Sequence, residues 1–244
     1  MEIEISLAAE PLFQIGPLTF TNSMLTSILV GLALVIGSLV LYRRGWNLVP
    51  GRFQALVEMG MEFIYNLCVA TAGKKIGRRI FPLVGTFFIF ILMANWGGIY
   101  PGHGSITLHN FEGHEVPLFR PANSDLNTTA AMAVVSILTV QVLSINVKGI
   151  GGYIKGFFEP ISIVSIILAP VHLIGEFSHL LSLSLRLFGN IFAGEVVTVV
   201  MFFLVPYVVP FAFLGLEMLF GFIQAMIFTV LSISYMALAT AKHD

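Results

Sequence analysis

The sequence contains few charged residues: Lys, Arg, Asp and Glu together make up 10% of its 244 residues, whereas hydrophobic residues make up 57%. Soluble globular domains carry about 25% charged residues, so this composition excludes an ordinary soluble domain and indicates an integral membrane protein. The formal net charge of −1 excludes the basic surface that nucleic-acid binding requires. The sequence also lacks a Cys/His metal cluster and a phosphate-binding glycine loop. We therefore expect no metal, no cofactor and no catalytic domain.

Cysteine and N-terminal basic residues are also scarce. The single cysteine, Cys68, excludes a disulfide within the chain and predicts a plain packing role. The first ten residues contain three glutamates and no Lys or Arg, whereas a secretory signal begins with a positive segment. We therefore expect the mature chain to start at Met1.

Long hydrophobic runs are abundant, and about 20 apolar residues are enough to span the hydrocarbon core of a bilayer. They predict an all-α membrane protein that forms one domain, with five crossing helices and one amphipathic helix on the membrane surface. Pro82 is expected in the first turn of the second crossing. The expected segments are a crossing at 20–42, the interfacial helix at 53–70, a crossing at 81–100, a solvated external loop at 101–124, and crossings at 125–147, 160–205 and 211–242.

The basic residues predict the orientation of the chain. With five crossings, ten of the twelve Lys and Arg residues fall on one side, and only Arg120 and Arg186 do not. Cytoplasmic loops are enriched in Lys and Arg, so that side is predicted to be cytoplasmic. We expect an external N-terminus and a cytoplasmic C-terminus. The short acidic N-terminus, in which we expect no targeting presequence, favours a location in the bacterial plasma (inner) membrane.

The last two crossings are too long to stand upright. Residues 170–205 alone give about 54 Å of helix against about 30 Å of hydrocarbon. The turn that joins them to residues 211–242 contains Pro206 and Pro210, which predicts a strongly tilted helical hairpin. An alternative breaks the first helix near Gly189 and gives six crossings.

Arg186 lies inside this apolar hairpin, where a charge costs about 2.5 to 3.5 kcal/mol on insertion scales. Helical periodicity places several polar residues on one stripe of the helix together with Arg186, and it places others on different faces. Glu195 is expected about 180° away on the same helix, and Glu217 and Gln224 share a face of the last helix. Two alternatives are structural: an ion pair between Arg186 and a glutamate, and histidines that serve only in packing. The stripe consists of His172, His179, Ser182, Arg186 and Asn190, with Glu176 at an intermediate angle.

Two sequences within the hairpin are similar to those of a known protein family. Residues 184–195, SLRLFGNIFAGE, and residues 224–235, QAMIFTVLSISY, closely resemble subunit a of F-type ATP synthases, the proton-channel subunit. The DLNTT sequence that starts at Asp125, the PLF sequence at Pro11 and the basic first cytoplasmic loop are similar to the same family. The resemblance thus covers essentially the whole chain.

The resemblance implies roles for individual residues. Arg186 would face the ring of c subunits, attract their carboxylates and separate two offset half-channels. Glu195 and Glu217 would line the external half-channel. Asn190 and Gln224 would lie beside the arginine. The cytoplasmic half-channel is implied to include residues from the set of His172, Glu176, His179 and Ser182, with the two histidines and the glutamate left as alternatives.

These expectations describe a proton-translocating stator subunit that performs no chemistry itself. Its implied partners are the c-subunit ring, a peripheral stalk of subunit b or b/b′, the remaining F1Fo subunits and membrane lipids. The alternatives are a stand-alone proton-coupled transporter or channel and a structural membrane scaffold. A transporter commonly contains internal repeats, and no repeat is visible in this sequence.

Overall fold

The computed structural model describes residues 9–16, 18–45, 49–99, 106–109, 115–158, 163–205 and 209–240, without the side chains of 15, 18, 153–173 and 176. The all-α class is confirmed, because five helices are long and apolar enough to cross a membrane. Short strands and 3-10 turns lie between some of them. The elements are β1 (Pro11–Ile15), β2 (Leu18–Thr21), α1 (Asn22–Arg44), α2 (Arg52–Trp96), η1 (Gly97–Ile99), β3 (Thr107–His109), β4 (Glu115–Pro117), η2 (Ala122–Ser124), α3 (Leu126–Phe158), α4 (Ile163–Leu204) and α5 (Val209–Thr240).

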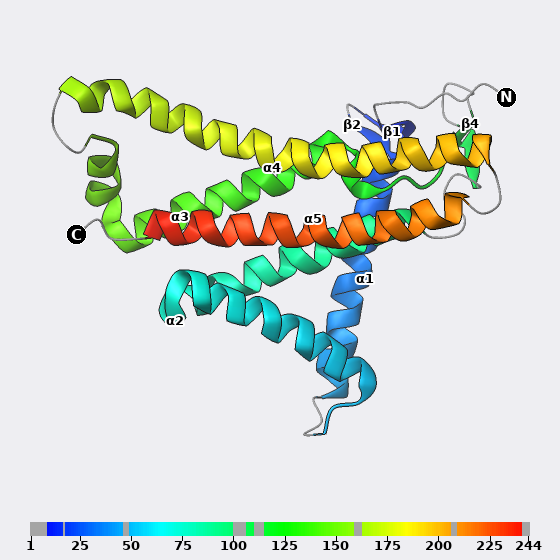
Figure 1. Ribbon diagram of the computed structural model, residues 1–244, viewed down its shortest axis with the longest axis horizontal. Coiled ribbons are helices and arrows are strands. Elements are labelled where there is room, and N and C mark those ends of the chain that lie inside the picture. Colours follow the sequence, from blue (N-terminus) through cyan, green and yellow to red (C-terminus); the bar gives the residue numbers. More distant parts are fainter. Residues whose placement is uncertain are drawn as a thin grey trace.

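Helix α1 stands apart from the others for most of its length. Thr21 caps its N-terminus by accepting a hydrogen bond from the Met24 backbone N–H, at 3.3 Å. Only residues near that end, such as Asn22 and Ser23, are buried, and most of the apolar side chains beyond them are exposed. In Figure 1, α1 runs across the direction of α4 and α5. Its apolar surface is therefore available to lipid or to another subunit.

Helix α2 is bent back on itself, as Figure 1 shows. Gly73 has a φ of 75°, which divides α2 into arms at 52–72 and 74–96. The first arm contains the segment expected as the interfacial helix, and the second arm contains residues 81–96 of the expected second crossing. The arms touch at Gly77, where an added Cβ would lie 2.6 Å from the Cys68 carbonyl oxygen. Pro82 was expected in a first turn but lies inside the second arm, because the basic residues before it continue the helix.

Helices α4 and α5 form a long hairpin in which the two elements lie side by side (Figure 1). They contain 42 and 32 residues, about 63 Å and 48 Å at 1.5 Å per residue. Helix α4 continues through Gly189, so the break of the six-crossing alternative is not present. One face of α4, which includes Leu183 and Leu187, is buried in the core formed with α2, α3 and α5.

The segment between α2 and α3 is not uniformly solvated. Strands β3 and β4 pair antiparallel within it. The following residues run into the interior, where Arg120 is 5% exposed and Asn123 is fully buried. The expected solvated loop is therefore wrong for residues 120–124, because these residues are buried and several of their polar groups find partners inside the protein. Asn123 Nδ2 donates to Asn95 Oδ1 at 2.6 Å, and Ser23 Oγ donates to Asp125 Oδ2 at 2.9 Å.

Candidate functional site

Arg186 lies on the face of α4 that points away from the core. Its side chain is exposed, and Nη2 donates a hydrogen bond to Ser182 Oγ at 3.1 Å. Ser182 and Asn190 are exposed on the same face, one helical turn to either side. Among the residues that the structure describes, Arg186 forms no ion pair with a carboxylate. The expected stripe is therefore present over 182–190, and it presents an exposed guanidinium to the surroundings of the chain.

One turn beyond the arginine, a hydrogen bond joins the two helices of the hairpin. Asn190 Nδ2 donates to Gln224 Oε1 at 2.8 Å. Gln224 is 1% exposed, so this amide pair holds a buried side chain of α5 against an exposed one of α4. The structure thus brings together the two polar residues that the sequence placed beside Arg186.

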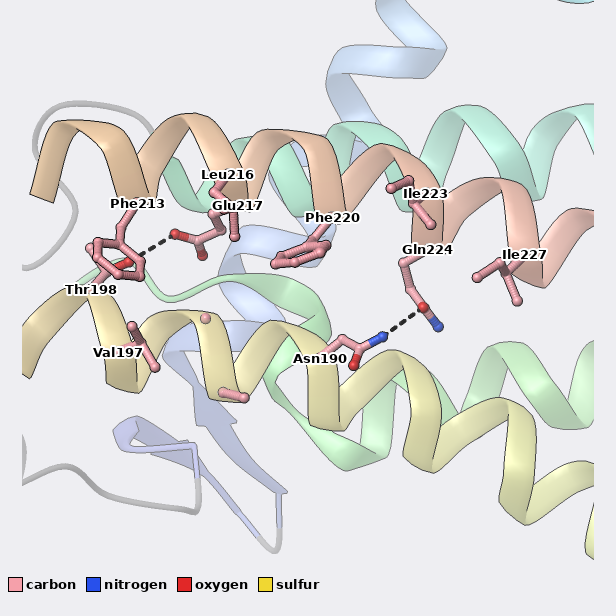
Figure 2. Close-up of a pocket in the computed structure, with 12 residues that line it drawn as sticks. Asn190, Val197, Thr198, Phe213, Leu216, Glu217, Phe220, Ile223, Gln224 and Ile227 are labelled. Atoms are coloured by element: carbon pink, nitrogen blue, oxygen red, sulfur yellow. Dashed lines mark hydrogen bonds between the residues drawn. The ribbon is translucent and has the colours of Figure 1, made fainter.

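A cavity of about 440 Å³ lies between α4 and α5. Figure 2 shows Asn190 and Gln224 toward one end, Thr198 and Glu217 toward the other, and apolar side chains such as Phe220 between them. An added Cβ at Gly194 would lie 3.5 Å from Glu217 Cγ, so this glycine brings the backbone of α4 close to the carboxyl side chain. The cavity therefore extends along the hairpin from the buried carboxyl group of Glu217 to the Asn190–Gln224 pair beside Arg186.

The two carboxyl groups predicted for the site have different partners. Glu217 is 9% exposed and accepts a hydrogen bond at Oε2 from Thr198 Oγ1, at 3.3 Å. Glu195 Oε1 lies 3.5 Å from Nε of Arg120. Gly194, the residue before Glu195, lies against Glu217 across the hairpin. Both side chains are therefore brought into one region at the same end of the hairpin.

Comparison with known proteins identifies the family. The sequence model of the ATP synthase A chain family matches residues 24–237. The chain belongs to the ATP synthase subunit a family. It is 37% identical over 226 residues to ATP synthase subunit a of Moorella thermoacetica, which covers 93% of this chain and 94% of that protein. The corresponding protein of Gloeobacter violaceus is 36% identical over 232 residues, with 95% and 89% of the two chains covered.

Family membership confirms the resemblance stated for the two hairpin motifs. Together with the five apolar helices, it identifies this member of the subunit a family as an integral membrane protein. Within the described ranges, no group of three or more His, Cys, Asp or Glu side chains is arranged to hold a metal ion.

Arg120 is the site residue that sequence reasoning missed in this subunit a family member. It pairs with Glu195, whereas one structural alternative paired a glutamate with Arg186. One indication was present in the sequence. The single positive charge of Arg186 could not balance the negative charges of three glutamates in the hairpin, Glu176, Glu195 and Glu217. The partner lies 75 residues earlier in the chain, beyond the reach of helical periodicity.

The structure describes only some of the residues predicted for a cytoplasmic half-channel. The ring of His179 stacks on Tyr235 of α5, with centroids 4.2 Å apart, and Ser182 bonds to Arg186. His172 and Glu176 belong to α4, but their side chains lie outside the part that the structure describes.

Proposed function

We propose that this chain is the proton-translocating stator subunit of the Fo sector of a rotary F-type ATP synthase. It is non-catalytic: it conducts protons to and from carboxylates on a rotating ring of c subunits, and partner subunits carry out ATP synthesis or hydrolysis. Its further partners are a peripheral stalk of subunit b or b/b′ and the remaining F1Fo subunits. Membership of the subunit a family supports this assignment.

The exposed guanidinium of Arg186 is the observation that carries the mechanism. A guanidinium stays protonated in proteins, so it provides a permanent positive charge. In our proposal, this charge faces the ring and attracts each c-subunit carboxylate as it arrives. It also repels protons that would pass directly from one half-channel to the other.

The external half-channel is proposed to run along the α4–α5 cavity. Glu195 and Glu217 take part at its outer end, and the Asn190–Gln224 pair lies at its inner end beside Arg186. The cavity supports this path because its lining includes Glu217 and both amides. A step of nine residues, about 13.5 Å along α4, separates Glu195 from Arg186.

The cytoplasmic half-channel is proposed on the other side of Arg186 along α4. Its candidate residues are His172, Glu176, His179 and Ser182. The proposal includes an external N-terminus, a cytoplasmic C-terminus and a location in the bacterial plasma (inner) membrane. In such an arrangement, α4 and α5 lie strongly tilted, since each is much longer than the hydrocarbon core is thick.

Replacing Arg186 tests the proposed function. Arg186→Ala removes the permanent charge, and we expect ATP-driven proton pumping by assembled complexes in inverted vesicles to be lost. The measurement is quenching of a pH-sensitive dye after ATP addition. Leu185→Ala is the matched control, because Leu185 is the preceding residue, 50% exposed and uncharged. Normal pumping by Arg186→Ala would refute the assignment.

A further inference from the structure

Arg120 is a buried cation that approaches the proposed proton path from outside the hairpin. It is 5% exposed, and its Nε donates a hydrogen bond to Ser124 Oγ at 3.0 Å while lying 3.5 Å from Glu195 Oε1. Its guanidinium carbon lies 6.0 Å from the centre of the Phe192 ring, one turn before Glu195. A buried charge is costly unless it is paired, so this environment holds the guanidinium on Glu195.

The segment that carries Arg120 is itself firmly held. Asn123 donates to Asn95 Oδ1 at 2.6 Å, and Asn95 in turn donates to the Gly221 carbonyl oxygen at 2.9 Å. Ser23 of α1 donates to Asp125 Oδ2 at 2.9 Å. These bonds tie the segment to α1 and α2, and through Asn95 to α5. Arg120 is therefore presented to α4 by a packed support, which is what precise placement of a functional side chain requires.

The ion pair distinguishes the two oxygens of the Glu195 carboxyl group. Oε1 is the atom near Arg120. Oε2 is buried and has no hydrogen-bond partner among the described residues. Glu217, the other carboxyl of the region, is held by the neutral hydroxyl of Thr198. Of these two carboxyl groups, only Glu195 has a cation beside it among the described residues, and this cation fixes which of its oxygens is engaged and which has no partner.

We propose that Arg120 is the positioning residue of Glu195 in proton transfer, an inference that rests on the proposed function. Arg120 holds Oε1, so that Oε2 accepts a proton from the external side and releases it toward Glu217. An O–H bond forms at Oε2 when the proton arrives from the external side, and the same bond breaks when the proton passes toward Glu217. The guanidinium keeps all its protons. Arg120 acts only through Glu195 and is not itself a proton carrier.

The test measures passive proton flux through Fo. Vesicles stripped of F1 are given a potassium diffusion potential, and flux is normalised to the amount of assembled Fo. We expect Arg120→Gln to lower flux about 10- to 100-fold, the range expected when a reacting group is misplaced by about 1 Å. Arg120→Lys, which keeps a buried cation, should recover part of this loss. Arg52→Gln is the matched control, because Arg52 is exposed at the start of α2 and should leave flux unchanged.

A double-mutant cycle separates positioning from a general structural role. Glu195→Asp keeps a carboxyl group but withdraws it from Arg120, so flux remains measurable. If Arg120 acts through Glu195, then Arg120→Gln should lower flux far less in the Glu195→Asp protein than in the wild type. If Arg120→Gln lowered flux by the same factor in the wild type and in the Glu195→Asp protein, the proposal would be overturned. Where Arg120→Gln reduces assembly, Arg120→Lys carries the same cycle.

The two proposals fail in different ways. Normal pumping by Arg186→Ala would refute the proposed function whatever Arg120 does. Loss of pumping in Arg186→Ala, combined with independent effects of Arg120→Gln and Glu195→Asp, would refute only the positioning role.

Discussion

At the scale of residues, Glu217 shows how a carboxyl group proposed to accept protons can be placed in an apolar hairpin. It is buried in a helix whose neighbouring cavity wall is mainly apolar, and Thr198 supplies a single neutral hydrogen bond. Gly194 leaves room for the side chain to lie against α4. The group is thus held in place without a permanent countercharge of its own among the described residues, and it borders the cavity that leads toward Asn190.

Glu217→Gln tests this role with little change in side-chain volume. We expect passive proton flux through Fo to fall about 100-fold with assembly intact, because an amide cannot take up and release the proton and such groups contribute about 10²- to 10⁴-fold. Thr198→Val removes the hydrogen bond but keeps the carboxyl group, so its effect should be much smaller. Flux in Glu217→Gln equal to that of the wild type would remove Glu217 from the path.

At the scale of elements, the bend of α2 depends on two glycines with different tasks. Gly73 supplies a positive φ at the bend, and Gly77 lets the second arm approach the backbone of the first at Cys68. The sequence predicted the apolar segments of α2 from their periodicity. It did not predict that Lys74, Lys75 and their neighbours continue the helix, because a basic run between two apolar segments is also typical of a loop.

Gly77→Ala should destabilise this bend. The new Cβ would lie 2.6 Å from the Cys68 carbonyl oxygen, so the arms must move apart at a cost of about 1–3 kcal/mol. The measurement is the unfolding temperature of the purified complex in detergent, together with the amount of assembled chain. Gly60→Ala is the control, because Gly60 lies in the same helix with nothing within 4 Å of an added Cβ. Equal stability of the two variants would show that the arms do not depend on close contact at Gly77.

At the scale of the whole molecule, the features that the sequence could predict are those that depend on the residue pattern within a single helix. The stripe of Ser182, Arg186 and Asn190 follows from helical periodicity, and α4 is long because its apolar run is long. The Arg120–Glu195 pair joins residues 75 positions apart, and the short strands form outside the apolar runs. Such features depend on how separate elements pack, which local pattern does not encode.

Packing also decides which surfaces remain for partners, and the face around Arg186 is proposed to meet the ring. Ala193 is exposed on this face and lines the cavity. With Ala193→Cys, we expect disulfide crosslinks to cysteines on the outer helix of the ring subunit, detected as a larger product on a non-reducing gel. Leu138→Cys is the control, because Leu138 is 58% exposed on α3 rather than on this face. The native Cys68 is fully buried and should give little background. Crosslinking at Leu138→Cys but not at Ala193→Cys would place the ring against a different surface.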